Sequence, residues 1–165
     1  MSPKRAGILK AARDQHSPCC VAAAVQDAGC GIKLPPPPRV VIDGTKYQRT
    51  HRAACRLCDS IVFWIPTGEA TATTFAVAIE LKGGKVPTKA AAQLQEGAKI
   101  VESLGSPDVR VRFAALIAKG RRVHPENYKV LMQKKVRFRS RDYPIKLVPC
   151  GFDLSTIATW GINEV

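Results

Sequence analysis

The sequence predicts one α/β domain with a mixed central sheet flanked by helices. A chain of 165 residues suits a single domain, and a hydrophobic content of 45% is enough for a core, which excludes a wholly disordered protein. The apolar patterns change along the chain in the order helix, three strands, helix and strand. That order is typical of α/β domains, in which helices cover a sheet.

The first 36 residues are expected to stand apart from the main domain, which we place at residues 37–165. Residues 1–17 are basic and weakly periodic, which predicts an arm or a frayed helix. Residues 18–30 begin with Pro18 and are rich in alanine, which predicts a short helix that ends near Gly29 or Gly31. A run of four prolines follows and predicts a stiff extended spacer.

Three strands are expected next. Residues 40–42 form a short apolar run that stops at Asp43-Gly44, a turn dipeptide. Residues 59–65 and 74–82 are longer and β-branched, and Gly83-Gly84 ends the second of them. Both are apolar on both faces until their charged ends, as in central strands with helices packed on them.

The second half continues with a helix, a strand and a short helix. From residue 88 to 104 the apolar residues step by three and four, with Pro87 before the start and Gly105 at the stop. Residues 111–118 predict a strand, and residues 125–135 predict a short helix.

The charged ends of the two long strands are predicted to meet. If these strands form an antiparallel hairpin folded between Glu69 and Ala70, Asp59 lies opposite Glu80. Lys82 is two residues further along and therefore shares the face of Glu80. Two carboxylates and an ammonium group would then converge at one edge of the sheet.

This arrangement predicts a divalent-metal site for phosphodiester hydrolysis. Two close carboxylates repel unless a cation lies between them, and oxygen ligands suit Mg²⁺ or Mn²⁺. The carbonyl of Leu81 is expected to complete the ligand set. Such an ion polarises a phosphoryl oxygen and acidifies a bound water, which Lys82 would orient. The alternative is an ordinary cross-strand ion pair. We favour the metal site because the Asp, the E-x-K pair and the following helix occur together.

Residues 58–63, 75–84 and 92–94 together resemble the PD-(D/E)XK nuclease superfamily, and the resemblance extends over about residues 39–120. It implies the restriction-endonuclease-like fold, with an αβββαβ core. It also implies that Asp59 and Glu80 hold the metal and that Lys82 assists the attacking water.

The resemblance adds a glutamine on the helix after the E-x-K strand, for which Gln93 is the better match and Gln95 the second. Two departures stand out: Cys58 replaces the proline of the motif, and the acidic residue of the first helix has only weak matches in Asp27 and Asp14. The number of metal ions, one or two, stays open.

The net charge of +13 predicts a polyanionic partner, and nucleic acid is preferred over an acidic membrane surface. No stretch approaches the ~20 apolar residues of a spanning helix. Between residues 107 and 146, twelve Lys and Arg stand against three acidic residues. Within residues 136–141 the arginines alternate, which on a strand would place them on one face for phosphate contact; the alternative is a solvated face. The candidate contacts are Arg121, Arg122, Lys134, Lys135, Arg137, Arg139 and Arg141.

Six cysteines without a regular framework predict free thiols and a cytoplasmic protein. Cys55 and Cys58, with His51 and either Cys150 or Cys30, have the residue types of a zinc site, but no second pair of matching spacing exists. We favour Cys58 as a packed core residue. His51 and Arg52 are further candidates for contact with the scissile phosphate.

We therefore expect a divalent-metal-dependent DNA endonuclease, active as a homodimer because cutting both strands takes two sites. The alternatives are a non-catalytic nucleic-acid-binding module on a nuclease-like scaffold, and a nuclease that acts on RNA.

Overall fold

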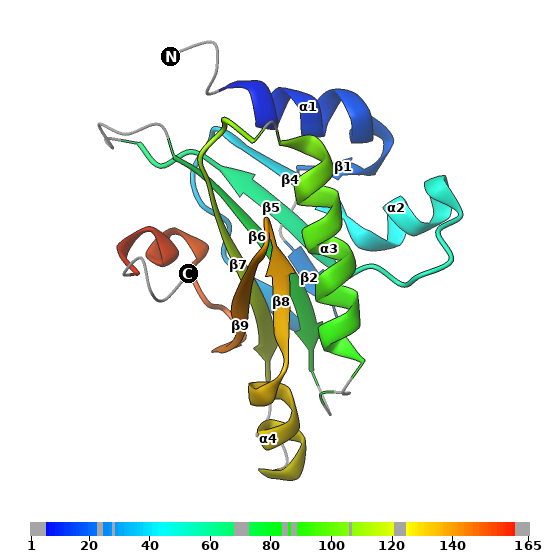
Figure 1. Ribbon diagram of the computed structural model, residues 1–165, viewed down its shortest axis with the longest axis vertical. Helices are drawn as coiled ribbons and strands as arrows, with labels where there is room; N and C mark the ends of the chain where they lie inside the picture. The colour runs from blue at the N-terminus through cyan, green and yellow to red at the C-terminus, as the bar shows by residue number, and fades with distance from the viewer. Residues whose placement is uncertain are drawn as a thin grey trace.

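The computed structural model describes residues 6–22, 25–27, 29–67, 73–83, 86, 89–105, 107–120 and 125–160. Within these residues, seven strands form one mixed sheet in the order β1-β4-β5-β6-β7-β9-β8, and β2 and β3 form a separate hairpin (Figure 1). The strands are β1 Cys20–Val21, β2 Val25–Asp27, β3 Cys30–Ile32, β4 Arg39–Asp43, β5 Ser60–Trp64, β6 Thr74–Lys82, β7 Val111–Lys119, β8 Lys135–Phe138 and β9 Arg141–Pro149. The helices are α1 Ala6–His16, α2 Gly44–His51, α3 Ala90–Leu104 and α4 Pro125–Gln133, with 3₁₀ turns η1 Ser17–Cys19 and η2 Leu154–Thr159.

The sheet is mixed because β6 pairs parallel with β7, and β7 parallel with β9, while the other neighbours are antiparallel. Helix α3 connects β6 to β7 and lies across the sheet in Figure 1. The α/β class with a mixed sheet flanked by helices is confirmed.

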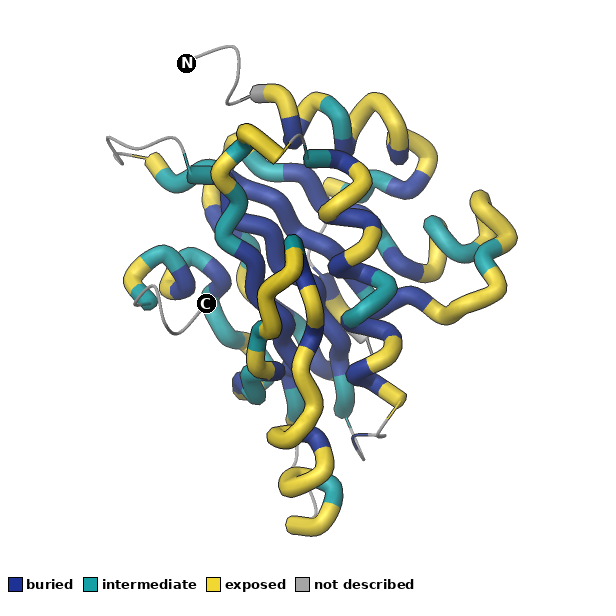
Figure 2. Tube along the Cα trace, viewed as in Figure 1, coloured by how far each residue is buried: buried dark blue, intermediate teal, exposed yellow. Residues whose placement is uncertain are grey.

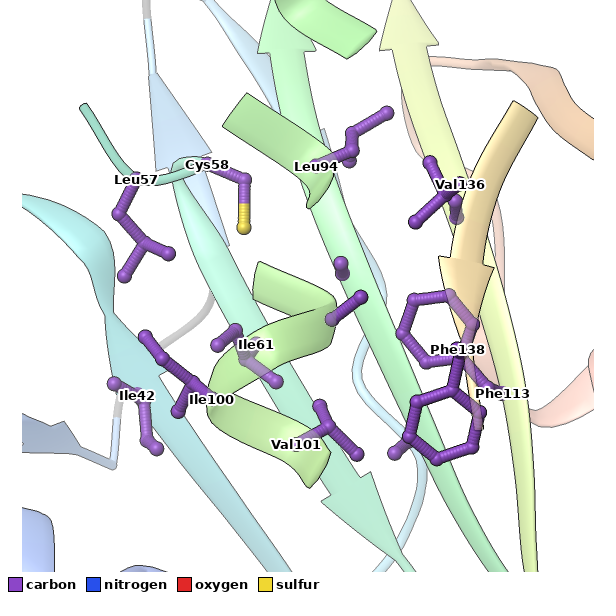
Figure 3. Close-up of a cluster of buried hydrophobic side chains, with 14 of the residues drawn as sticks. Ile42, Leu57, Cys58, Ile61, Leu94, Ile100, Val101, Phe113, Val136 and Phe138 are labelled. Carbon is purple, nitrogen blue, oxygen red and sulfur yellow. The ribbon is translucent and has the colours of Figure 1, made fainter. Parts of the chain in front are cut away.

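The two faces of the sheet carry separate buried clusters. Alternate residues of a strand point to opposite faces, so Ile61 and Phe63 pack with α3 and α1, while Val62 and Trp64 pack with β3 and η2. Figure 2 shows the central strands buried along their length, and Figure 3 shows part of the α3-side cluster. Both clusters include residues of β6, up to Ala78 on the α3 side and up to Leu81 on the other, which fixes the backbone that carries the charged residues.

The helix expected over residues 18–30 is wrong. Pro18 lies within a single 3₁₀ turn, η1, and the chain then forms β1 and the β2–β3 hairpin. The alanine-rich sequence favours a helix locally, but Val25 and Ile32 are buried against the second cluster, and tertiary packing overrides propensity. The preceding segment is a packed helix, α1, with Ile8 buried against the α3-side cluster.

The turn expected at Asp43-Gly44 is instead the start of a helix. Asp43 ends β4, and its Oδ1 accepts a hydrogen bond of 2.8 Å from the backbone N–H of Lys46, which caps α2. A β-carbon on Gly44 would stand 1.8 Å from the carbonyl oxygen of Cys58. Glycine therefore lets the first turn of α2 lie directly against the segment before β5.

The expectation of free thiols is wrong for two of the six cysteines. Cys30 at the start of β3 and Cys150, which directly follows β9, form a disulfide, while Cys19, Cys20, Cys55 and Cys58 are free. The two partners are 120 residues apart, and only the folded chain brings them together. No helix within the described residues is long and apolar enough to cross a membrane.

Candidate active site

The ends of β5 and β6 bring Asp59 and Glu80 together as the sequence predicted. The strands pair Ser60 with Ile79, so Asp59 and Glu80 form the next pair in register. The backbone N–H of Asp59 donates to Glu80 Oε2 at 3.2 Å, and the N–H of Leu81 donates to Asp59 Oδ2 at 2.6 Å. Each carboxylate is therefore held by the backbone that carries the other.

Lys82 completes the group. Its Nζ lies 2.5 Å from Glu80 Oε1, and the two side chains are 17% and 0% exposed. A buried charge has lost its hydration, so it is unfavourable unless a partner of opposite charge lies close to it. Lys82 is that partner for Glu80. The predicted set of two acids and a lysine therefore meets at one end of β6.

The pKa of Glu80 is raised, first because burial disfavours its charged form and second because Asp59 is close. The ammonium group of Lys82 and the N–H of Asp59 oppose this shift without cancelling it. A buried acid with a raised pKa beside a second acid is typical of functional sites.

These residues fit a hard divalent cation. Among the described residues, no third His, Cys, Asp or Glu joins the two carboxylates. The carbonyl of Lys82 accepts from the N–H of Gly120, on the β7 side. Backbone groups of successive strand residues point to opposite sides, so the carbonyl of Leu81 faces the β5 side of β6. Two carboxylates, one carbonyl and several waters are a ligand set that Mg²⁺ accepts.

Gln93 lies behind the site rather than in it. Gln93 is 3% exposed, and its side-chain Nε2 donates to the Leu57 carbonyl at 3.3 Å. The backbone carbonyl of Gln93 accepts from the N–H of Cys58 at 3.2 Å. Its Oε1 is buried with no hydrogen-bond partner among the described residues. Gln93 therefore positions the two residues that precede Asp59.

The second candidate glutamine serves another part of the fold. Gln95 exchanges two hydrogen bonds with the backbone of Arg137, of 2.9 and 2.8 Å, and ties α3 to β8. The weak candidates for a further acid do not join the site either: Asp14 pairs with Lys10 on α1, and the side chain of Asp27 lies outside the described part of the chain.

A polar hollow of about 250 Å³ opens beside Asp59. Arg56, Thr45 and Asp43 line it, and none of them was among the candidate residues from the sequence. Asp43 lies there because β4 pairs it with Ser60, and Thr45 because the first turn of α2 packs on residues 58–59. Arg56 belongs to the segment that leads into β5. The remaining lining residues are Val21, Val25, Gln26, Ser60 and Leu81. A larger hollow, of about 400 Å³ between α2 and α3, touches neither of the two acids nor Lys82.

The residues of the considered zinc site form no metal-binding group within the described part of the chain, and Cys30 and Cys150 are joined in the disulfide. Cys58 is fully buried, its Sγ donates to the Ser60 carbonyl at 3.4 Å, and Figure 3 shows it directed into the core beside Ile61. Burial also raises the pKa of the Cys58 thiol, whereas zinc needs a thiolate. His51 stacks on Tyr47 with ring centroids 4.2 Å apart. Cys58 is thus a packed core residue, as the sequence favoured.

The row of arginines on one strand is wrong. Strand β8 ends at Phe138, Arg139 and Ser140 form a two-residue turn with positive φ angles of 47° and 63°, and Arg141 begins the returning strand. Arg139 has a structural role, because its Nη1 donates to the Val109 carbonyl at 2.7 Å.

The other basic candidates divide in two. Lys134, Lys135, Arg137 and Arg141 are exposed on and beside the β8–β9 hairpin. Arg121 and Arg122 lie outside the described residues. The hairpin therefore presents a cationic surface, although not the regular row that the sequence suggested.

Comparison of the chain with protein-family models, with curated proteins and with solved structures finds no match. The function must therefore be argued from the site itself.

Proposed function

We propose that this protein is a divalent-metal-dependent endonuclease that hydrolyses phosphodiester bonds in DNA. The observation that carries the proposal is the meeting of Asp59, Glu80 and Lys82 at the edge of the sheet. The net charge of +13 supports a polyanionic substrate.

The proposed roles follow from the contacts. Asp59 and Glu80 would hold Mg²⁺ or Mn²⁺ with the Leu81 carbonyl, and the ion would supply charge stabilisation at the scissile phosphate and acidify water. Lys82 would orient the attacking water and stabilise negative charge in the transition state. Gln93 would keep Asp59 in place through Leu57 and Cys58.

We also propose that the sheet and its helices form a restriction-endonuclease-like core. The elements α1, β4, β5, β6, α3 and β7 follow one another in the order that the resemblance implies, with β1–β3 and α2 as additions. The resemblance to the PD-(D/E)XK superfamily remains part of this proposal.

Incubation of the purified protein with labelled duplex DNA and Mg²⁺ or Mn²⁺ tests the activity. We expect the wild type to cleave the DNA. Glu80→Ala and Lys82→Ala should each reduce the cleavage rate by at least about a hundredfold. Glu96→Ala is the matched control, because Glu96 pairs with Lys99 on the surface of α3. Equal activity in all four proteins would reveal a contaminating nuclease and contradict the proposal.

One observation favours a second function, a non-catalytic nucleic-acid-binding module. Glu80 is completely buried and both its oxygens are engaged, by Lys82 and by the N–H of Asp59. If this ion pair never opens, the protein would bind DNA and cleave nothing with any metal. RNA is a further candidate substrate, because metal-assisted hydrolysis needs no 2′-hydroxyl; parallel assays on RNA of the same sequence separate the two.

A homodimer and a cytoplasmic location complete the proposal. Light scattering of the protein with and without DNA tests the dimer, since cutting both strands takes two sites.

The Cys30–Cys150 disulfide weighs against the cytoplasm, because disulfides persist in oxidising compartments. Trapping the thiols in intact cells before lysis determines which state the protein has there.

A further inference from the structure

We propose that the hollow beside Asp59 binds a second backbone phosphate, which flanks the scissile one, and that Arg56 is the residue that holds it. The inference rests on the proposed function, because the ligand is a phosphate of the same nucleic acid strand. It adds a substrate-binding residue that lies outside the group of two acids and a lysine.

The shape of the hollow suits such a group. The hollow is lined by Arg56, Asp59 and Ser60 and by Val25 and Gln26 of β2. Its volume of about 250 Å³ is several times the ~30 Å³ that a water molecule occupies in the liquid. A phosphate group and its waters therefore have room.

Arg56 is the one cation among the described residues that line the hollow, beside the two carboxylates of Asp43 and Asp59. Asp43 is engaged, since its Oδ1 accepts from the N–H of Lys46. Asp59 accepts from the N–H of Leu81 and is assigned to the metal in the proposed function. Arg56 is exposed, and within the described part of the chain it forms no hydrogen bond or ion pair. A guanidinium group that has no partner among the described residues and belongs to a residue lining a polar hollow matches the paired oxygens of a phosphate.

The hydroxyl of Thr45 adds a neutral donor. It lines the hollow and, among the described residues, has no hydrogen-bonding partner. Hydroxyl donors commonly accompany arginine at backbone phosphates of nucleic acids.

The bound phosphate is a neighbour of the scissile one, because the hollow and the ion pair lie on opposite faces of the sheet. Ser60 and Leu81 line the hollow, whereas Glu80 does not. Successive residues of β6 point to opposite faces, so Glu80 and Lys82 belong to the α3 side. Asp59 lies at the sheet edge that both sides share. A nucleic acid strand that passes over this edge would place one phosphate at the metal and the next at Arg56.

Binding of labelled duplex DNA in Ca²⁺, without cleavage, tests this role. Arg56→Ala should weaken binding about tenfold and reduce the slope of log K against log salt by ~0.9, the value of one lost phosphate contact. Arg56→Lys should keep the slope. Arg49→Ala is the matched control: Arg49 is also exposed and lies on α2, but it does not line the hollow. Thermal unfolding of each variant checks that the fold is intact.

The outcomes separate this inference from the proposed function. If Arg56→Ala and Arg49→Ala weaken binding equally, Arg56 contributes only general charge and the inference is wrong, while cleavage by the wild type would still support the nuclease. If Arg56→Ala leaves DNA binding unchanged and tightens binding of Mn²⁺ alone, the hollow is a cation site and the inference is also wrong. If the wild type binds no DNA, both proposals fail.

Discussion

Cys58 and Gly97 lie so close that a β-carbon on Gly97 would stand 2.8 Å from the Cys58 Sγ. The same β-carbon would lie 3.0 Å from Cβ of Ala78 on β6. The absence of a side chain at Gly97 therefore lets α3 approach both strands of the site. Because Cys58 immediately precedes Asp59, this contact links the packing of α3 to the position of a proposed metal ligand.

Gly97→Ala is expected to destabilise the protein by about 1–3 kcal/mol, the usual effect of overpacking a filled core. Denaturant titration measures this change. Adding Cys58→Ala should recover part of the loss, since it removes the closer of the two contacts. Strictly additive effects of the two substitutions would show that the contact is not the cause.

Glu80→Gln is expected to stabilise the metal-free protein at neutral pH. The folded state raises the pKa of Glu80 above its ordinary value of 4.5, so the folded state keeps a proton that the unfolded state has lost. The contribution of Glu80 to the free energy of unfolding is therefore fully present below its ordinary pKa and is lost as pH rises through its folded pKa. Glutamine removes this dependence.

Urea titrations of wild type and Glu80→Gln in a chelator, from pH 4 to pH 8, check this expectation. Their difference in unfolding free energy should grow with pH in favour of the variant. A variant that is less stable than the wild type at pH 8 would mean that the ion pair with Lys82 outweighs burial and the charge of Asp59.

Gln93 and Gln95 provide a matched test of positioning. Both glutamines of α3 hydrogen-bond to backbone, but Gln93 holds Leu57 and Gln95 holds Arg137. Gln93→Ala should reduce kcat about tenfold with little change in KM, because Asp59 loses its support. Gln95→Ala should leave kcat unchanged. Equal kcat in the two variants would remove the positioning role of Gln93.

The register of β5 and β6 could be predicted because alternation and charged ends are local signals. The position of Asp59 opposite Glu80 followed from those signals by geometry alone. Helix α2 was missed because Asp43-Gly44 fits both a turn and a helix start. The β2–β3 hairpin was missed because the alanine-rich sequence around it favours a helix locally. Burial of Val25 and Ile32 and the Cys30–Cys150 disulfide favour the hairpin instead, and neither is visible in the local sequence. Arg56 was missed because it lies in the irregular segment between α2 and β5, whose course no periodic pattern predicts.

Loss of the Cys30–Cys150 disulfide is expected to destabilise the protein by about 2–5 kcal/mol. The bond joins β3 to the residue that follows β9, and Val25 and Gln26 of the paired strand β2 line the hollow. Thermal unfolding with and without a reductant measures the effect. A reductant should lower the Tm of the wild type and leave that of Cys30→Ser/Cys150→Ser unchanged. Equal shifts in both proteins would assign the effect to another thiol.

The central claim is that Asp59 and Glu80 together hold a divalent cation. Titration of the metal-free protein with Mn²⁺, followed by calorimetry, tests it without any assay of cleavage. The wild type and Asp14→Asn, an exposed acid on α1, should each bind Mn²⁺, while Asp59→Asn and Glu80→Gln should each lose that binding. Unchanged binding in the latter two variants, or none in the wild type, would contradict the account.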